Sequence, residues 1–212
     1  MRSLSAFSVL VLAVASLISS SAYADDLFPP PWRGQPGSTT QEWEFSTPMP
    51  VSPPDAMMNP YGEPSAAAYP GTGQSWLDDW GGRQGMWPLS GTIEVTIPNS
   101  SIPNPYKDIW VQLTWARQVE SSTPVVWEMN SNAVGTVVSD VILGPTGLPA
   151  PSDFWYHTTF LIHIEPNPAW EIVKIDGTVV VDQLVIDTIC APEPASLLLL
   201  GLGGLALRRR RA

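Results

Sequence analysis

Cysteine and basic residues are both scarce in this chain of 212 residues. Cys190 is the only cysteine, so no intrachain disulfide can form and the fold must be stabilised by packing. Its thiol either pairs with a second chain or serves as a small apolar residue at the end of a strand.

Between residues 25 and 191, five basic residues stand against 19 acidic ones, a net charge of −14. Such a surface repels nucleic acid and anionic lipid, and it suits divalent cations, neutral polymers or simple solubility.

The sequence also lacks the motifs of common enzymes. It has no GxSxG, HExxH or phosphate-binding loop and no paired nucleophile and base, so we expect no catalytic residue. His157, His163 and Glu165 share one face of a predicted strand and are residue types that bind zinc. However, positions six apart on an extended strand are separated by about 20 Å, so we expect no zinc site there.

The first 24 residues have the features of a secretory signal peptide. Arg2 supplies a positive charge, residues 4–18 form an apolar core, and Ala22-Tyr23-Ala24 is a small-x-small cleavage site. We therefore expect a signal helix over residues 1–24 and an exported chain that begins near residue 25.

Residues 25–70 are predicted to form a proline-rich arm. Eleven prolines lie between Leu27 and Pro70, and proline fixes φ and removes a ladder donor. Most of this arm should be extended or turn-like. One strand is expected over residues 41–46, where Trp43 and Phe45 share a face.

Residues 71–190 alternate between apolar and polar side chains in several short runs separated by Pro, Gly, Asn and Ser. The runs are Ile93-Val95-Ile97, Ile109-Val111-Leu113-Trp115, Val125-Trp127-Met129 and Tyr156-Phe160-Ile162-Ile164, with β-rich segments at 134–143 and 177–189. Strict alternation predicts half-buried strands, and no helix of ten or more residues is expected between the two terminal segments. The predicted fold class is therefore all-β, an antiparallel β-sandwich or jelly-roll.

Tryptophans are numerous, and they can either stack on sugar rings or fill a core. Trp43, Trp115 and Trp127 alternate with polar residues and are predicted core residues, whereas Trp110 shares a face with Gln112 and Thr114. Candidate ligand-binding residues are Trp76, Asp78, Asp79, Trp80, Trp87 and Trp110. The loop that holds the first five either forms a ligand or calcium site or covers one end of the sandwich.

Asp182 is the candidate metal ligand. It shares its predicted strand face with Val180, Leu184 and Ile186, and a buried carboxylate needs hydrogen bonds or a cation. Two interpretations are open. Either Asp182 binds calcium as a cofactor, or backbone amides at a bulge or sheet end donate hydrogen bonds to its carboxylate. The strand resembles the last strand of galactose-binding-like jelly-roll domains, which implies carbohydrate or calcium binding.

The chain ends on a short apolar segment and a basic cluster. Residues 195–207 would span roughly 20 Å as a helix, less than the about 30 Å of a bilayer core. Arg208, Arg209, Arg210 and Arg211 follow and would act as a cytoplasmic anchor. A short transmembrane helix is therefore predicted over 195–207, with Pro192-Glu193-Pro194 just outside the inner membrane.

This ending resembles the PEP-CTERM sorting signal of bacterial exosortase substrates. Pro192, Glu193 and Pro194 match the motif, residues 195–207 the span and Arg208–Arg211 the basic cluster. The resemblance implies a membrane-held precursor, an exosortase as processing partner, and delivery to the cell surface or beyond. Such systems accompany exopolysaccharide and biofilm production.

Taken together, the sequence predicts an exported, non-enzymatic surface or extracellular-matrix protein with a structural or adhesive role, with exopolysaccharide as a candidate partner. Two alternatives stay open. The first is a carbohydrate-binding module, which a patch of exposed coplanar aromatics would favour. The second is a polysaccharide-active enzyme, which a groove with two convergent acids would favour.

Overall fold

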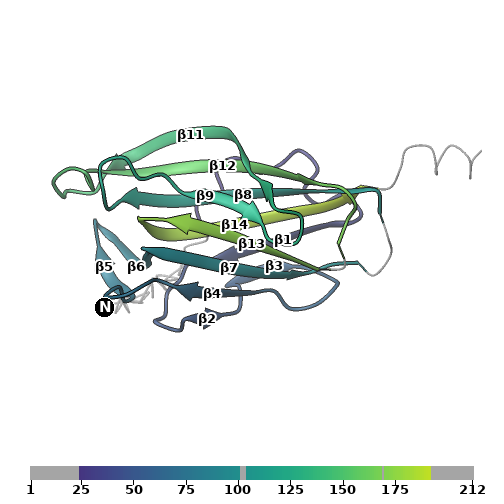
Figure 1. The fold of residues 1–212 in the computed structure, drawn as a ribbon, viewed down its shortest axis with the longest axis horizontal. Coiled ribbons are helices and arrows are strands. Elements are labelled where there is room, and N and C mark those ends of the chain that lie inside the picture. Colours follow the sequence, from purple (N-terminus) through teal and green to yellow (C-terminus); the bar gives the residue numbers. More distant parts are fainter. Residues whose placement is uncertain (1–23, 101–103, 169, 192–212) are drawn as a thin grey trace, which may run out of the picture.

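The chain folds into two packed antiparallel sheets, as a computed structural model of residues 24–100, 104–168 and 170–191 describes it (Figure 1). Fourteen strands are present in the described residues: β1 (Ser38–Trp43), β2 (Val51–Ser52), β3 (Ala56–Met58), β4 (Ser65–Tyr69), β5 (Leu77–Trp80), β6 (Arg83–Pro88), β7 (Gly91–Pro98), β8 (Tyr106–Arg117), β9 (Val125–Glu128), β10 (Ala133–Val134), β11 (Thr136–Pro145), β12 (Phe154–Ile164), β13 (Trp170–Gly177) and β14 (Val179–Ala191). The described residues contain no helix, which confirms the all-β prediction.

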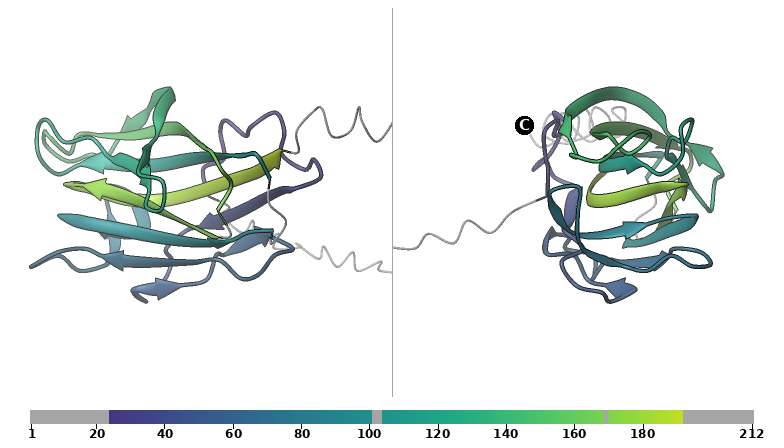
Figure 2. Two further views of the ribbon diagram at one scale, coloured as in Figure 1. Left: turned by 45° about the vertical axis from the view of Figure 1, so that its right-hand side comes forward. Right: turned by 90° about the vertical axis from the view of Figure 1, so that its left-hand side faces the viewer.

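The two sheets have six strands each along their main path. Sheet A has the order β11-β12-β8-β14-β1-β3, and the β5–β6 hairpin joins it through a short pairing of β6 with β14. Sheet B has the order β10-β9-β13-β7-β4-β2. The longest strands of both sheets run along the long axis of the molecule, and the end view shows the two layers in cross-section (Figures 1 and 2). The architecture is a β-sandwich.

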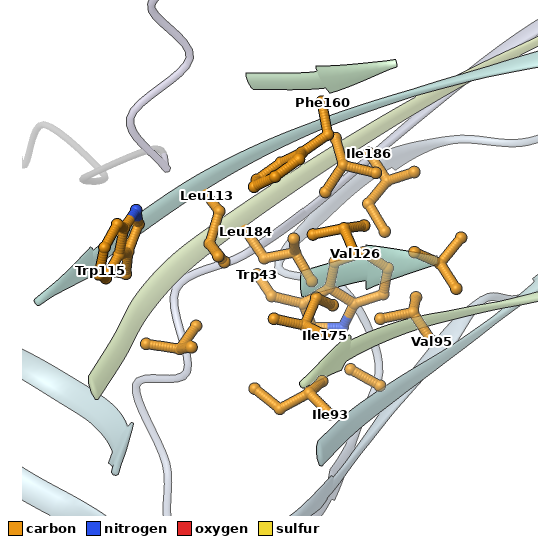
Figure 3. Close-up of a cluster of buried hydrophobic side chains, with 14 of the residues drawn as sticks. Trp43, Ile93, Val95, Leu113, Trp115, Val126, Phe160, Ile175, Leu184 and Ile186 are labelled. Atoms are coloured by element: carbon orange, nitrogen blue, oxygen red, sulfur yellow. The ribbon is translucent and has the colours of Figure 1, made fainter. Parts of the chain in front are cut away.

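The core lies between the sheets and is built by the predicted alternation. Leu113 of β8 and Leu184 and Ile186 of β14 point from sheet A toward Ile93, Val95 and Ile175 of sheet B (Figure 3). Trp43 and Trp115 are buried in the same cluster, as predicted. Each large aliphatic side chain buried here contributes about 1.5–3 kcal/mol.

Residues 25–70 are more ordered than a proline-rich arm. One strand was expected near 41–46, whereas the structure has β1 at Ser38–Trp43 and three further strands, β2, β3 and β4. β1 and β3 belong to sheet A and β2 and β4 to sheet B, so residues 38–69 are part of the sandwich and no boundary falls at residue 70. Strands as short as two or three residues, broken by proline, leave little periodic signal.

The first described segment, residues 24–37, has no strand and lies against sheet A. We call it the N-terminal strap. It contains two turns, closed by hydrogen bonds from Arg33 N to Pro30 O and from Gln35 N to Trp32 O, both 3.1 Å. Cys190 N donates to Gly37 O at 3.3 Å, which places the end of the strap beside the end of β14.

One strand faces the opposite way from the prediction. In β9 the buried residues are Val126 and Glu128, whereas Trp127, expected in the core, is half-buried on the outer side. The Trp127 indole donates to Asp176 Oδ2 at 2.5 Å and lies under the Lys174 ammonium. The inward Glu128 carboxylate accepts hydrogen bonds from the backbone of Asn130 and Ser131 at 3.0 and 2.7 Å. Turn capping therefore outweighs the burial of an indole here.

The predicted signal helix over residues 1–24, apart from Ala24, and the predicted transmembrane helix over 195–207 lie outside the described residues. Within the ranges that the structure does describe, no helix of membrane-spanning length and hydropathy was found.

Candidate functional site

The tryptophan-rich segment predicted as a ligand loop is the β5–β6 hairpin, at one end of the sandwich. Gly81 and Gly82 form its two-residue turn with φ of 62° and 77°, a left-handed pair that glycine adopts without strain. A Cβ on Gly81 would approach Thr146 and Trp155 to 3.2 Å, so this turn also packs closely. The hairpin is joined to the start of β14 by the pairing of Trp87 with Val181.

Two surface hollows flank the hairpin. One, of about 350 Å³, is lined by Gln74, Leu77, Trp80, Gln118, Ser152 and Val180, among others. The other, of about 450 Å³, is lined by Arg83, Leu143, Thr146, Trp155 and the glycines of the turn and its neighbours. The Trp80 and Trp155 rings stand between them, edge to face, with centroids 5.5 Å apart and an interplanar angle of 86°. The aromatic pair is therefore not coplanar.

Of the predicted ligand residues, only Trp80 lines either of these two hollows. Trp87 is buried in the core, and the Trp76 indole donates to Phe45 O at 2.8 Å and packs against that core. Asp78 and Asp79 are exposed on β5. Trp110 lies away from the hairpin, on β8, where its indole donates to Phe28 O of the strap at 2.8 Å.

Asp182 has a cationic partner from the protein itself. It lies at a bulge of β14, between the pairings of Val181 and Gln183 with β8, and is 1 % exposed. Arg83 of β6 donates to its carboxylate at 2.6 Å and to Asp25 of the strap at 2.7 Å. Burial raises the pKa of Asp182 to about 6, against the opposing effect of Arg83. No group of three or more His, Cys, Asp or Glu side chains suited to a metal ion occurs among the residues that could be described.

The two histidines lie in different surroundings. His157 is fully buried, with its Nδ1 3.1 Å from Thr114 Oγ1, and burial lowers its pKa. His163 is exposed and lies 2.6 Å from Asp108 and 3.1 Å from Glu165, contacts that raise its pKa.

Sequence reasoning missed a buried polar layer on the outer face of sheet A. Gln112 and Thr114 of β8 and Asp187 of β14 alternate with core residues, yet each is at most 1 % exposed. The strap covers them. Arg33 donates to both oxygens of Asp187 at 2.7 and 2.6 Å and also pairs with Asp26. Two signals could have suggested this layer: an Asp-Asp pair at the expected cleavage site and a lone arginine shortly after it.

The strap is also held through its backbone and its first residues. Phe28 N donates to Gln112 Oε1 at 2.7 Å, and Gln112 Nε2 donates to Asp26 Oδ1 at 2.6 Å. Asp25 N donates to Gln183 Oε1 at 2.7 Å. Charged and amide side chains thus fix a segment that its prolines alone would leave loosely attached.

A second buried polar cluster lies at the opposite end of the sandwich, where β14 ends. Lys107 of β8 pairs with Glu171 of β13, so the ion pair joins the two sheets, and both side chains are fully buried. Burial raises the pKa of Glu171 to about 7, although Lys107 opposes that shift. Cys190, opposite Lys107 in the sheet, is buried and donates to Asn99 Oδ1 at 3.0 Å, which fits the structural role considered for it.

Comparison with known proteins identifies the ending of the chain. Residues 191–211 match the family model of the PEP-CTERM protein-sorting motif. The match begins at Ala191, the last residue of β14, so the sorting signal follows the sandwich directly. No curated protein and no solved structure matches the chain. The family of the β-sandwich itself is therefore not identified.

Proposed function

We propose that this protein is an exported surface or extracellular-matrix component, sorted by an exosortase through residues 192–211, with a structural or adhesive and non-enzymatic role. The match of residues 191–211 to the PEP-CTERM sorting motif carries the proposal. The signal-peptide features of residues 1–24 support it independently, since export requires an N-terminal address.

The position of the sorting signal supports a display role. The signal follows Ala191 at one end of the sandwich, whereas the β5–β6 hairpin joins β14 near its first residues, Val180 and Val181. Ten or eleven residues of extended strand span about 35 Å. A chain held by its tail would therefore present the hairpin and its two hollows at the far end from the membrane.

The composition is compatible with an extracellular location. The sandwich is stabilised by packing and buried ion pairs and needs no disulfide, and its acidic surface favours solubility. In an exopolysaccharide matrix, a compact acidic sandwich can act as a spacer or an adhesive unit.

Carbohydrate binding is the second candidate, and the hollow of about 350 Å³ beside Trp80 favours it. It combines a half-buried indole face, which can stack on a sugar ring, with the amide oxygens of Gln74 and Gln118, which can accept from sugar hydroxyls. The Gln118 amide nitrogen is already bonded, to Leu89 O and Val179 O at 2.9 and 2.7 Å. The size of the hollow suits one or two sugar units.

A glycan array probed with residues 25–191 tests this candidate. Loss of a signal in Trp80→Ala but not in Trp170→Ala, whose indole is exposed on sheet B, would place the sugar in this hollow.

The sorting proposal is tested by changing the signal in a host with an active exosortase. Replacing Pro192-Glu193-Pro194 with three alanines leaves the span and its charges, so the full-length precursor should accumulate in the inner membrane. Replacing Arg208–Arg211 with serines should instead weaken membrane retention, because a span of about 20 Å depends on its basic anchor. Fractionation and the mass of the C-terminal peptide report both results. Normal processing of the triple-alanine variant would contradict the proposal.

A further inference from the structure

The start of the strap lies among carboxylates that outnumber their cationic partners. Asp25 and Asp182 share one guanidinium, that of Arg83, which pairs with them at 2.7 and 2.6 Å. Glu44 is linked to the group through Gln183, whose amide nitrogen donates to Glu44 Oε2 at 2.8 Å. The other oxygen, Glu44 Oε1, is buried and has no hydrogen-bond partner in the described part of the chain.

The backbone nitrogen of Asp25 lies at the same place. It donates to Gln183 Oε1 at 2.7 Å, on the side chain whose nitrogen holds Glu44. In the precursor this nitrogen belongs to a neutral peptide bond. Cleavage after Ala22-Tyr23-Ala24 would turn it into an α-ammonium with three protons and a positive charge.

We infer that the α-ammonium of Asp25, created when the signal peptide is removed, is a structural cation that docks among Gln183, Glu44 and Asp182 and locks the strap onto sheet A. The inference rests on the proposed export, and it adds a structural role for the processing step. It would give Glu44 Oε1, which has no hydrogen-bond partner among the described residues, a cationic partner in the processed chain.

The raised pKa of Glu44 is consistent in direction with a site that is poor in positive charge. Burial raises the pKa of Glu44 to about 7, the Gln183 hydrogen bond opposes the shift, and the carboxylates of Asp182, Asp55 and Asp25 raise it further. The charged and titratable groups that face the site are Asp25 and Asp26 of the strap, Glu44 and Asp55 beside β1, Arg83 of β6, His157 of β12 and Asp182 of β14. An ammonium there would favour the ionised form of Glu44.

The test compares two chains that end at residue 191 and differ only in whether residues 21–24 precede Asp25. One begins at Asp25, made by a protease that leaves no extra residue, and the control begins at Ser21, which keeps the Asp25 N–H bond but moves the charge away. Both contain every described strand and the hydrophobic cluster between the sheets, so each should fold. At pH 6.5 we expect the Asp25 chain to have a Tm about 2–6 °C higher.

The pH dependence separates the charge from other effects of the extra residues. An amine docked among carboxylates has a folded pKa above its unfolded value of about 8, so its stabilisation is complete below that pH and is lost as the pH rises through the folded pKa. The difference in Tm should therefore close at high pH. Equal Tm values at pH 6.5, or a difference that is independent of pH, would overturn the inference.

Glu44→Gln provides a second test, because it should change the Tm in opposite directions in the two chains. In the Ser21 chain it removes a half-buried carboxylate that is bonded by the Gln183 amide and by no cation of the described residues, and it should raise the Tm at pH 7.5. In the Asp25 chain it removes the partner of the ammonium and should lower the Tm. The same change in both chains would contradict docking.

N-terminal sequencing of the exported protein completes the test: a start at Asp25 supports the inference and any other start overturns it. The sorting proposal is tested by the mass of the C-terminal peptide, whereas this inference is tested by the N-terminus and the Tm. The two proposals can therefore fail independently.

Discussion

Lys107→Met tests a fully buried ion pair inside the sandwich. Lys107 and Glu171 are both fully buried, and their ion pair joins β8 of sheet A to β13 of sheet B. Removing one partner of such a pair leaves an uncompensated buried charge and costs about 3–5 kcal/mol. For a domain of this size that corresponds to a Tm lower by roughly 6–20 °C.

The loss should depend on pH in a definite direction. Burial already raises the pKa of Glu171 to about 7, and removing the lysine raises it further. A carboxyl group whose folded pKa exceeds its unfolded value of about 4.3 takes up a proton on folding, so the variant should regain stability as the pH falls from 8 to 5. Urea unfolding at pH 8 and pH 5 measures this.

Two matched variants complete the experiment. Lys174→Met breaks the surface pair with Glu94, whose 2.6 Å contact lies between partly exposed side chains, and should cost less than about 1 kcal/mol. The double variant Lys107→Met/Glu171→Leu replaces the buried pair by apolar groups and should recover most of the loss. If Lys107→Met is no worse than Lys174→Met, or the double variant no better than the single one, the reasoning is refuted.

Three further outcomes follow from the site. Arg33→Gln should cost about 2–3 kcal/mol in urea unfolding and expose the strap to proteases, because it strips the buried Asp187 of its cation; unchanged cleavage would contradict this. Calcium should not shift the Tm of residues 25–191, because Arg83 already occupies Asp182; a rise that Asp182→Asn abolishes would restore the calcium reading. Trp80→Ala should leave the Tm within about 2–4 °C of the parent while removing any glycan binding; retained binding would exclude the hollow.

The core could be predicted from the sequence because alternation is informative wherever one strand face is apolar. Ile93, Val95 and Ile97 and the matching run in β8 are buried as expected. The prediction was wrong for Trp127, because the choice of face in β9 depends on the backbone amides that Glu128 caps and on the distant Asp176. A pattern within one strand does not contain that information.

The outer face of sheet A was unpredictable for a different reason. Gln112, Thr114 and His157 are the polar partners of an alternating pattern, which normally indicates solvent. They are buried because the strap covers them: Asp26 and Phe28 hydrogen-bond to Gln112, Asp25 accepts from Thr114, and the Phe28 ring lies against His157. Long-range polar contacts of this kind leave no periodic signal, whereas the sorting motif at the C-terminus could be read directly because it is contiguous.

The most direct test of the proposed sorting is the C-terminal mass of the unmodified protein in two otherwise identical hosts, one with an exosortase and one without. With the enzyme, the chain recovered outside the inner membrane should lack Arg208–Arg211. Without it, the chain should keep these residues and remain with the inner membrane. The same C-terminus and the same location in both hosts would contradict the account.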